Sequence, residues 1–198
     1  GTCLAPAAMA ETAVKFGTNW VAQGEHGGFY LAVEDGSYKA CGLDVTIVPG
    51  GPQVNNRAMM LAGKVDFNMA GNLLSTFNAA AEGVPVVAVA AIFQKEPQVF
   101  LTHPGKGKTF EDLKKLKIYV SDEGFASYYM WMKSAYGFTD EQREVYTFNM
   151  APFIADENSA IQGYVSSEPL MVEKEAGWKP DELLLADAGY STYSTLIE

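Results

Sequence analysis

The sequence predicts an α/β fold made of two halves, each with a mostly parallel β-sheet. From residue 13 onward, apolar segments of strand length alternate with longer segments of helical periodicity, a pattern typical of βαβ units. At residues 104–108 the composition changes to PGKGK, which is typical of a crossing between two halves. With 198 residues, of which 48% are hydrophobic, the chain is long enough to bury one large core or two smaller ones.

The first half is predicted to alternate strands and helices up to residue 92. Strand patterns cover residues 13–19, 44–49 and 65–70. Helical patterns cover residues 27–38, 54–62 and 73–82, and the last two end at Gly63 and Gly83. The nearly continuous apolar run VPVVAVAAI at residues 84–92 predicts a central strand that is covered on both faces.

The second half repeats the same rhythm. Helices are expected at residues 110–115, 127–136, 156–162 and 169–176, and strands at residues 117–120, 145–149, 163–166 and 183–187. The whole chain is therefore divided into a signal-peptide remnant at 1–10, lobe 1 at 11–104, lobe 2 at 105–188 and the start of a segment returning to lobe 1 at 189–198.

Charge and cysteine content exclude several classes of protein. The net charge of −10 and the pI near 4.7 disfavour nucleic acids and anionic membrane surfaces as partners. No apolar stretch reaches the roughly 20 residues that a membrane-spanning helix needs. Cys3, Cys41, His26 and His103 are too few for a disulfide framework or the usual zinc site. No metal or cofactor is expected.

The N-terminal segment is small and apolar. Ala8, Met9 and Ala10, directly before Glu11, match the A-x-A pattern of signal peptidase cleavage. We expect the end of a cleaved signal peptide here and hence a periplasmic location, and the alternative is a frayed, alanine-rich terminus.

Candidate ligand contacts in the first half follow its strands, because ligands of parallel sheets bind beyond the carboxyl ends of the strands. The loop after the first strand is long and combines an indole, an amide, a carboxylate and an imidazole. The candidates are Asn19, Trp20, Glu25, His26, Phe29, Gly51 and Asn72. The alternatives are core packing for Trp20, a helix-start charge for Glu25, a plain turn for Gly51 and a helix cap for Asn72.

Candidates in the second half follow two strands. Glu123, Phe125, Ser127 and Tyr128 come after the strand at 117–120, at the start of a helix. Glu168 stands directly before Pro169, which is suited to start the next helix, and is the preferred polar anchor for a ligand. The alternative for Glu123 and Glu168 is a favourable charge in the first turn of a helix.

No set of residues has the spacing of a catalytic site. The sequence lacks a nucleophile elbow, metal-ligand spacing and a phosphate-binding loop. The residues alone therefore predict a protein that binds a small molecule, without enzyme activity.

Several of these loops resemble one known family. The motifs are TNW at 18–20, EHGGFY at 25–30, GLDV at 42–45 with GGP at 50–52, AGKVDF at 62–67, SDEG at 121–124 and YVSSEP at 164–169. They are similar to the NMT1/THI5-like family of periplasmic proteins that bind thiamine precursors, which is related to the sulfonate and nitrate binding proteins.

The resemblance implies a type II periplasmic-binding fold, in which two α/β lobes close on a ligand. It implies a monomer that delivers a pyrimidine-like ligand to an ABC permease and its ATPase. Aromatic rings would stack on the ligand and a carboxylate would accept from its amino group. The residues in these roles would be Trp20, Phe29 and Phe125 or Tyr128 for stacking, and Glu168 or Glu25 for the carboxylate.

Two departures from the family pattern are visible. The family's chains are longer and return to the first lobe, so part of lobe 1 is expected to lie outside this sequence. The cysteine-rich iron motif of the related fungal pyrimidine synthases is absent, which disfavours that enzyme activity. A synthase and a periplasmic ligand sensor remain the alternative functions.

Overall fold

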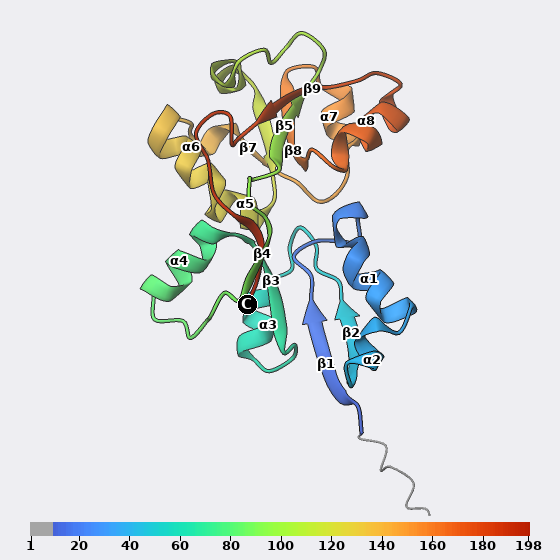
Figure 1. Ribbon diagram of the computed structural model, residues 1–198. Helices are drawn as coiled ribbons and strands as arrows, with labels where there is room; N and C mark the ends of the chain where they lie inside the picture. The colour runs from blue at the N-terminus through green and yellow to red at the C-terminus, as the bar shows by residue number, and fades with distance from the viewer. Residues whose placement is uncertain (1–9) are drawn as a thin grey trace, which may run out of the picture.

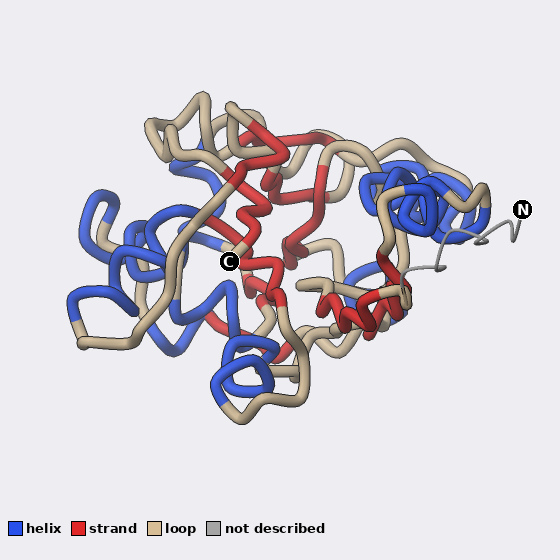
Figure 2. The backbone as a smooth tube through the Cα atoms, turned by 60° about the horizontal axis from the view of Figure 1, so that its bottom comes forward, coloured by secondary structure: helices blue, strands red, loops and turns tan. Residues whose placement is uncertain are grey.

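The computed structural model describes residues 10–198 and contains two α/β lobes (Figure 1). Each lobe is built on a five-stranded sheet with mixed strand directions. The expected signal-peptide remnant lies outside the described residues except for Ala10, and so does Cys3. Figure 2 shows the strands in the middle of the molecule with helices around them. The α/β prediction is confirmed, but the sheets are mixed and not mostly parallel, because β10 (Ser194–Ile197) in lobe 1 and β5 (Gln98–Thr102) in lobe 2 run antiparallel to their neighbours.

The sheet of lobe 1 has the strand order β2-β1-β3-β10-β4. β1 (Thr12–Gly17) pairs in parallel with β2 (Leu43–Val48) and with β3 (Phe67–Asn72). β10 (Ser194–Ile197) comes from the far end of the chain and runs antiparallel to β3 and to β4 (Ala90–Phe93). The last residues of β1 lie beside the first residues of β3, because Phe16 pairs with Phe67 and Gly17 with Asn68.

Four helices accompany this sheet: α1 (Gly27–Glu34), α2 (Ser37–Ala40), α3 (Asn56–Leu61) and α4 (Leu73–Ala81). A short 3₁₀ turn, η1 (Gly24–His26), precedes α1. The single helix expected at 27–38 is split in two because Gly36 has a left-handed φ of 79°.

The sheet of lobe 2 has the order β7-β6-β8-β5-β9. Its strands are β5 (Gln98–Thr102), β6 (Lys117–Val120), β7 (Arg143–Val145), β8 (Ser159–Tyr164) and β9 (Asp181–Leu184). β6 is parallel to β7 and β8, whereas β5 is antiparallel to β8 and β9. Because β5 and β8 are buried at every position but Tyr164, the hydrophobic core of this lobe extends over both faces of its sheet.

The helical segments of lobe 2 are η2 (Phe110–Lys115), α5 (Asp122–Ala126), α6 (Tyr128–Tyr136), η3 (Asp140–Gln142), α7 (Ala151–Ala155) and α8 (Glu168–Ala176). α5 starts directly after β6, and α8 follows β8 after a short turn. The first turns of both helices consequently point toward lobe 1 (Figure 1). Among residues 10–198, no helix is long and apolar enough to cross a membrane.

The prediction of a central strand at residues 84–92 is wrong. Only β4 forms, and it lies at the edge of the sheet. Val87 and Val89 are 73% and 65% exposed. Pro85 cannot donate a backbone hydrogen bond, and the place beside β3 is taken by β10 from more than 100 residues away.

The prediction of a helix at residues 156–162 is also wrong, and β5 was not expected. Asp156 instead forms a turn that ends α7, with Oδ1 accepting from the Asn158 N–H at 2.9 Å. β8 then pairs with β5, so the chain crosses into lobe 2 before Gln98 and not at residue 104. The first crossover is the segment at residues 94–97 between β4 and β5, and the chain returns to lobe 1 between β9 and β10.

Candidate functional site

Two cavities lie where the lobes meet. The larger encloses about 530 Å³ between α3, β3 and α4 of lobe 1 and α5 of lobe 2. The smaller, of about 40 Å³, lies between the loop after β1 and the ends of β6 and β8. Asn19 and Glu123 line both cavities. One residue from each lobe therefore stands at the boundary between them.

Asn19 is oriented by His26. The backbone N–H of Gln23 donates to His26 Nδ1 at 3.3 Å, so Nδ1 carries no proton. Nε2 must then carry it and donate to Asn19 Oδ1 at 3.1 Å. Burial lowers the pKa of His26, although the charge of Glu25 opposes this shift. The lowered pKa keeps the ring neutral. The Asn19 amide nitrogen therefore faces away from His26 and can donate a hydrogen bond to a ligand.

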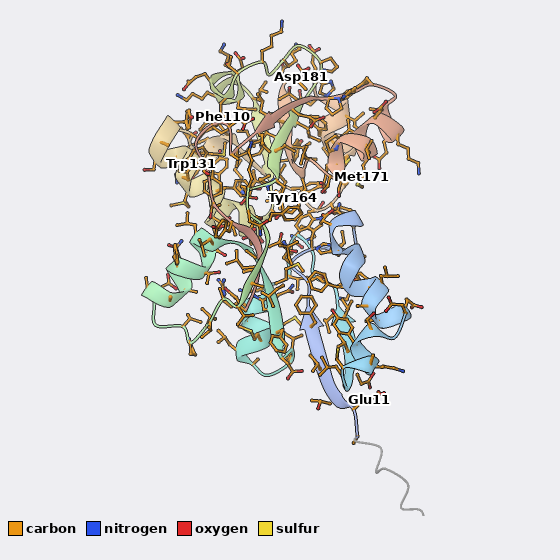
Figure 3. The ribbon with its side chains drawn as sticks, in the orientation of Figure 1. Glu11, Phe110, Trp131, Tyr164, Met171 and Asp181 are labelled. Atoms are coloured by element: carbon orange, nitrogen blue, oxygen red, sulfur yellow. The ribbon has the colours of Figure 1, made fainter. Side chains whose placement is uncertain are left out.

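Glu168 closes the two lobes on each other. Its Oε1 accepts from Gln23 Nε2 at 2.9 Å, and its Oε2 accepts from the Tyr164 N–H at 2.7 Å. Burial raises the pKa of Glu168, and these two donors oppose that shift. Figure 3 places Tyr164 at the level where the lobes meet. Both carboxylate oxygens of Glu168, the residue preferred as a ligand anchor, thus accept hydrogen bonds from other residues of the protein.

Glu25 makes a second connection between the lobes. Its Oε2 accepts from Ser167 Oγ at 2.7 Å and from Ser166 Oγ at 3.2 Å. Together with the Gln23–Glu168 bond, this fastens the loop after β1 onto the start of α8.

Glu123 reaches from α5 across to β3. A Cβ atom at Gly71 would lie 2.4 Å from Glu123 Oε1, so only glycine leaves room for this carboxyl group. Burial raises the pKa of Glu123, while the charge of Arg57 opposes the shift. The carboxyl group is therefore held at the boundary of both cavities by the shape of β3.

Gly71→Ala is expected to move this carboxyl group without unfolding the protein. The clash involves the end of a flexible side chain, so the free energy of unfolding should change by less than about 1 kcal/mol. The Glu123 carboxyl group should leave the boundary of the two cavities, which a crystal structure of the variant would show. Gly27→Ala is the control, because a Cβ there meets nothing within 4 Å. An unchanged position of this carboxyl group in Gly71→Ala would contradict this role of Gly71.

Three of the predicted aromatic contacts are packing residues. Trp20 lines the smaller cavity, but its ring stacks on Tyr146 with centroids 6.0 Å apart. Phe29 packs on Phe16 at 4.9 Å in the core of lobe 1 and lines neither cavity. Phe125 lies under the Arg143 guanidinium at 4.4 Å and also lines neither cavity. The tertiary structure gives Trp20 the role of joining the lobes.

The remaining predicted residues are placed in supporting positions. Asn72 caps α4, accepting from the Ser75 N–H at 3.1 Å. Gly51 is buried beside Val21 and Val54 and lines neither cavity. Of the two residues at the start of α6, Ser127 lines the larger cavity and Tyr128 is buried beneath it in the core.

Several functional candidates were missed by sequence reasoning. Arg57 lines the larger cavity and binds the buried carboxylate of Glu198 at 2.6 Å and 3.0 Å. Gln98 and Gln162 line the smaller cavity from β5 and β8. The run Asn55-Asn56-Arg57 at the polar start of α3 was a visible signal, whereas the two glutamines lie in strands that were not predicted. Within the described part of the chain, no cluster of His, Cys, Asp and Glu side chains is suited to hold a metal ion.

Solved structures with the same fold include periplasmic binding proteins. The periplasmic aliphatic sulphonate binding protein SsuA from Escherichia coli covers 94% of this chain with a TM-score of 0.63 and 19% identity. An arginine-specific periplasmic binding protein of Salmonella typhimurium covers 94% of this chain with a TM-score of 0.63 and 15% identity. A protein of Bordetella bronchiseptica covers 95% of this chain with a TM-score of 0.71 and 14% identity. The matches cover 64%, 84% and 64% of those chains, respectively. The fold is that of the type II periplasmic binding proteins.

Sequence comparison points to one family. The 4-amino-5-hydroxymethyl-2-methylpyrimidine phosphate synthase of Schizosaccharomyces pombe is 30% identical over 118 residues, which are 59% of this chain. The match spans only 34% of the length of that synthase. The family described as NMT1/THI5 like matches residues 23–197. Because this match covers most of the chain and reaches into both lobes, the chain belongs to the NMT1/THI5-like family.

Proposed function

We propose that this protein is the periplasmic solute-binding component of an ABC importer, and that it captures a pyrimidine-like ligand between its lobes. The observation that carries the proposal is the pair of cavities lined by polar groups of both lobes, with Asn19 and Glu123 shared between them. A ligand held there touches both lobes, so it stabilises the closed form.

The charges of the larger cavity favour a ligand that donates hydrogen bonds. Glu82, Asp122 and Glu123 line it. Asp122 is paired with Arg143, and Arg57, the one cation among the described lining residues, is paired with Glu198. A free anion such as nitrate or a sulfonate finds no unpaired cation there. A volume of about 530 Å³ lies within the range of small-molecule sites. An amino-substituted heterocycle matches this lining, and the name of the yeast relative contains such a pyrimidine.

Delivery to a membrane permease is part of the proposal. The neighbours named above include periplasmic binding proteins for a sulphonate and for arginine, which supports a role in uptake. The expected partners are the permease and the ATPase of the importer, with the binding protein acting as a monomer in the periplasm. Gln23 and Glu25 belong to the lobe-1 surface that meets lobe 2, so an open and a closed form would present different surfaces to the permease.

Ligand-dependent thermal stability tests the binding proposal. We expect 4-amino-5-hydroxymethyl-2-methylpyrimidine to stabilise the protein by about 2.7 kcal/mol at a concentration of 100 Kd. Glu123→Gln should reduce this stabilisation, because it removes a charged acceptor shared by both cavities. Glu144→Gln, on exposed β7, is the control. Arginine, ethanesulfonate and nitrate complete the panel, and stabilisation by one of these but not by the pyrimidine would contradict the ligand class.

A second candidate is an enzyme of pyrimidine synthesis, favoured by the 30% identity to the yeast synthase. Formation of a pyrimidine from added precursors by the purified protein would support this candidate. Tight pyrimidine binding without any turnover would favour the binding protein.

A further inference from the structure

We propose that Gln98 and Gln162 form a recognition pair in the smaller cavity, reading the edge of a 4-aminopyrimidine where a ring nitrogen lies beside the amino group. This inference rests on the proposed function and deepens it by naming the groups that select the ligand. Both residues lie on lobe 2 and line the smaller cavity, with 5% and 7% of their surfaces exposed.

The orientation of the Gln162 amide follows from its two partners. The backbone N–H of Ser121 contacts one terminal atom of Gln162 at 2.6 Å, and the Tyr128 hydroxyl contacts the same atom at 2.7 Å. A backbone N–H can only donate, so this atom is the carbonyl oxygen. The Gln162 amide nitrogen has no hydrogen-bond partner among residues 10–198 and is available to donate to a ligand.

The Gln98 amide is oriented in the opposite sense. Its Nε2 donates to the backbone carbonyl of Gly163 at 2.9 Å. A carbonyl oxygen can only accept, so the atom facing it is the nitrogen. The Gln98 carbonyl oxygen is left without a donor in the described part of the chain. One glutamine therefore offers a donor and the other an acceptor.

The strand register places the two side chains together. Gln98 on β5 is opposite Tyr164 on β8, and Gln162 is opposite Phe100. Residues two apart in a strand face the same side, so Gln98 and Gln162 are diagonal neighbours on one face of the sheet. Such neighbours lie within reach of long side chains and can contact one ligand edge.

The size of the smaller cavity limits what enters it. About 40 Å³ is enough for a few water-sized groups, so the edge of a ring fits and a whole ligand does not. The substituents of the ring would extend past Asn19 and Glu123 into the larger cavity. In this orientation Gln162 Nε2 donates to a ring nitrogen, and the exocyclic amino group donates to Gln98 Oε1.

The pair should discriminate by hydrogen bonding and not by shape. A ligand that fills the cavity without the amino group leaves the buried Gln98 oxygen unpaired, which costs about ten- to a hundredfold in affinity. We therefore expect wild-type protein to bind 4-amino-2-methylpyrimidine at least about tenfold more tightly than 2,4-dimethylpyrimidine. The two ligands have the same ring and nearly the same outline.

Titration calorimetry of the full chain with these two probes is the test, at an alkaline pH where the ring nitrogens carry no proton. Gln162→Glu keeps an oxygen facing Ser121 and Tyr128 but replaces the donor by an acceptor. It should weaken binding of the aminopyrimidine about tenfold and create affinity for acetamidinium, which has two donors. Gln94→Glu, the same change at an exposed position, should behave like wild type.

Each outcome supports or overturns a distinct statement. Equal affinity of wild type for both pyrimidines would overturn the recognition pair while leaving the proposed function intact. Binding of neither pyrimidine would overturn the pyrimidine ligand class and the recognition pair together. If the buried charge of Gln162→Glu prevents folding, the two-probe comparison on wild type and on Gln98→Met still decides. Gln98→Met removes the acceptor of the amino group, so loss of the preference in this variant is the expected result, and a preference that persists would overturn the pair.

Discussion

Glu96→Gln is expected to raise the free energy of unfolding at neutral pH by about 2–3 kcal/mol. Glu96 lies in the crossover between the lobes, and its Oε2 is buried without a hydrogen-bond partner in the described residues. Burial, together with the charge of Glu123, raises its pKa to about 8. The folded protein must therefore keep this group protonated at neutral pH, whereas the unfolded chain ionises it freely. Glutamine removes that cost while retaining the shape.

The pH dependence of stability provides the measurement. Between pH 4.5 and about 8 the folded protein binds one more proton at Glu96 than the unfolded chain does. The stabilising effect of this proton is complete below pH 4.5 and is lost as the pH rises toward 8. Urea unfolding across this range should give a falling curve for wild type and a flatter one for Glu96→Gln. The control is Glu173→Gln, at an exposed site on α8, which should leave the curve unchanged. If the free energy of unfolding of Glu96→Gln falls with pH as steeply as that of wild type, Glu96 is ionised in the folded protein.

Arg57→Met is expected to lower the free energy of unfolding by about 3 kcal/mol. The Glu198 side chain is fully buried and receives hydrogen bonds from Arg57, Thr76 and Asn68. Burial by itself would raise the pKa of Glu198, but these donors and the charge of Arg57 hold it below its ordinary value. Without Arg57 a buried carboxylate loses its counter-charge, which is the costly way to break a buried pair.

A double-mutant cycle separates the pair from the two residues individually. Glu198→Gln in the Arg57→Met background should recover part of the loss, because the unpaired charge is removed. The control is Lys95→Met, which breaks the exposed Lys95–Asp187 pair and should change stability by less than about 1 kcal/mol. If urea unfolding shows equal losses of the free energy of unfolding for Arg57→Met and Lys95→Met, the burial of Glu198 does not make its ion pair more important for stability than an exposed pair.

Local patterns in the sequence were sufficient for the elements that are amphipathic and that pair with their sequence neighbours. The strand at 117–120 matches β6 at both ends, and the helix at 73–82 matches α4 to within one residue. Both elements follow hydrophobic periodicity, and glycines or polar caps mark their ends. The α/β class follows from such elements alone.

Long-range pairing decided the elements that were predicted wrongly. The run at 84–92 is as apolar as a central strand, but β10 occupies the place beside β3 and leaves much of the run exposed. β8 contains the polar residue Gln162, which obscured its strand pattern. β5 directly follows a proline, in a segment for which the sequence pattern predicted no strand. No local signal shows that these two strands pair with each other across 60 residues.

The candidate site divides in the same way. The loops after β1 and β6 and before α8 could be predicted, because polar residues at strand ends are visible in the sequence. Which atoms face a ligand depends on partners that are distant in the chain. Gln23 donates a hydrogen bond to Glu168, and Glu123 lies against Gly71. The Gln162 oxygen accepts hydrogen bonds from Ser121 and Tyr128. Sequence periodicity determines which face of an element is apolar, but a hydrogen bond requires two groups within about 3 Å, and only the tertiary structure brings such groups together.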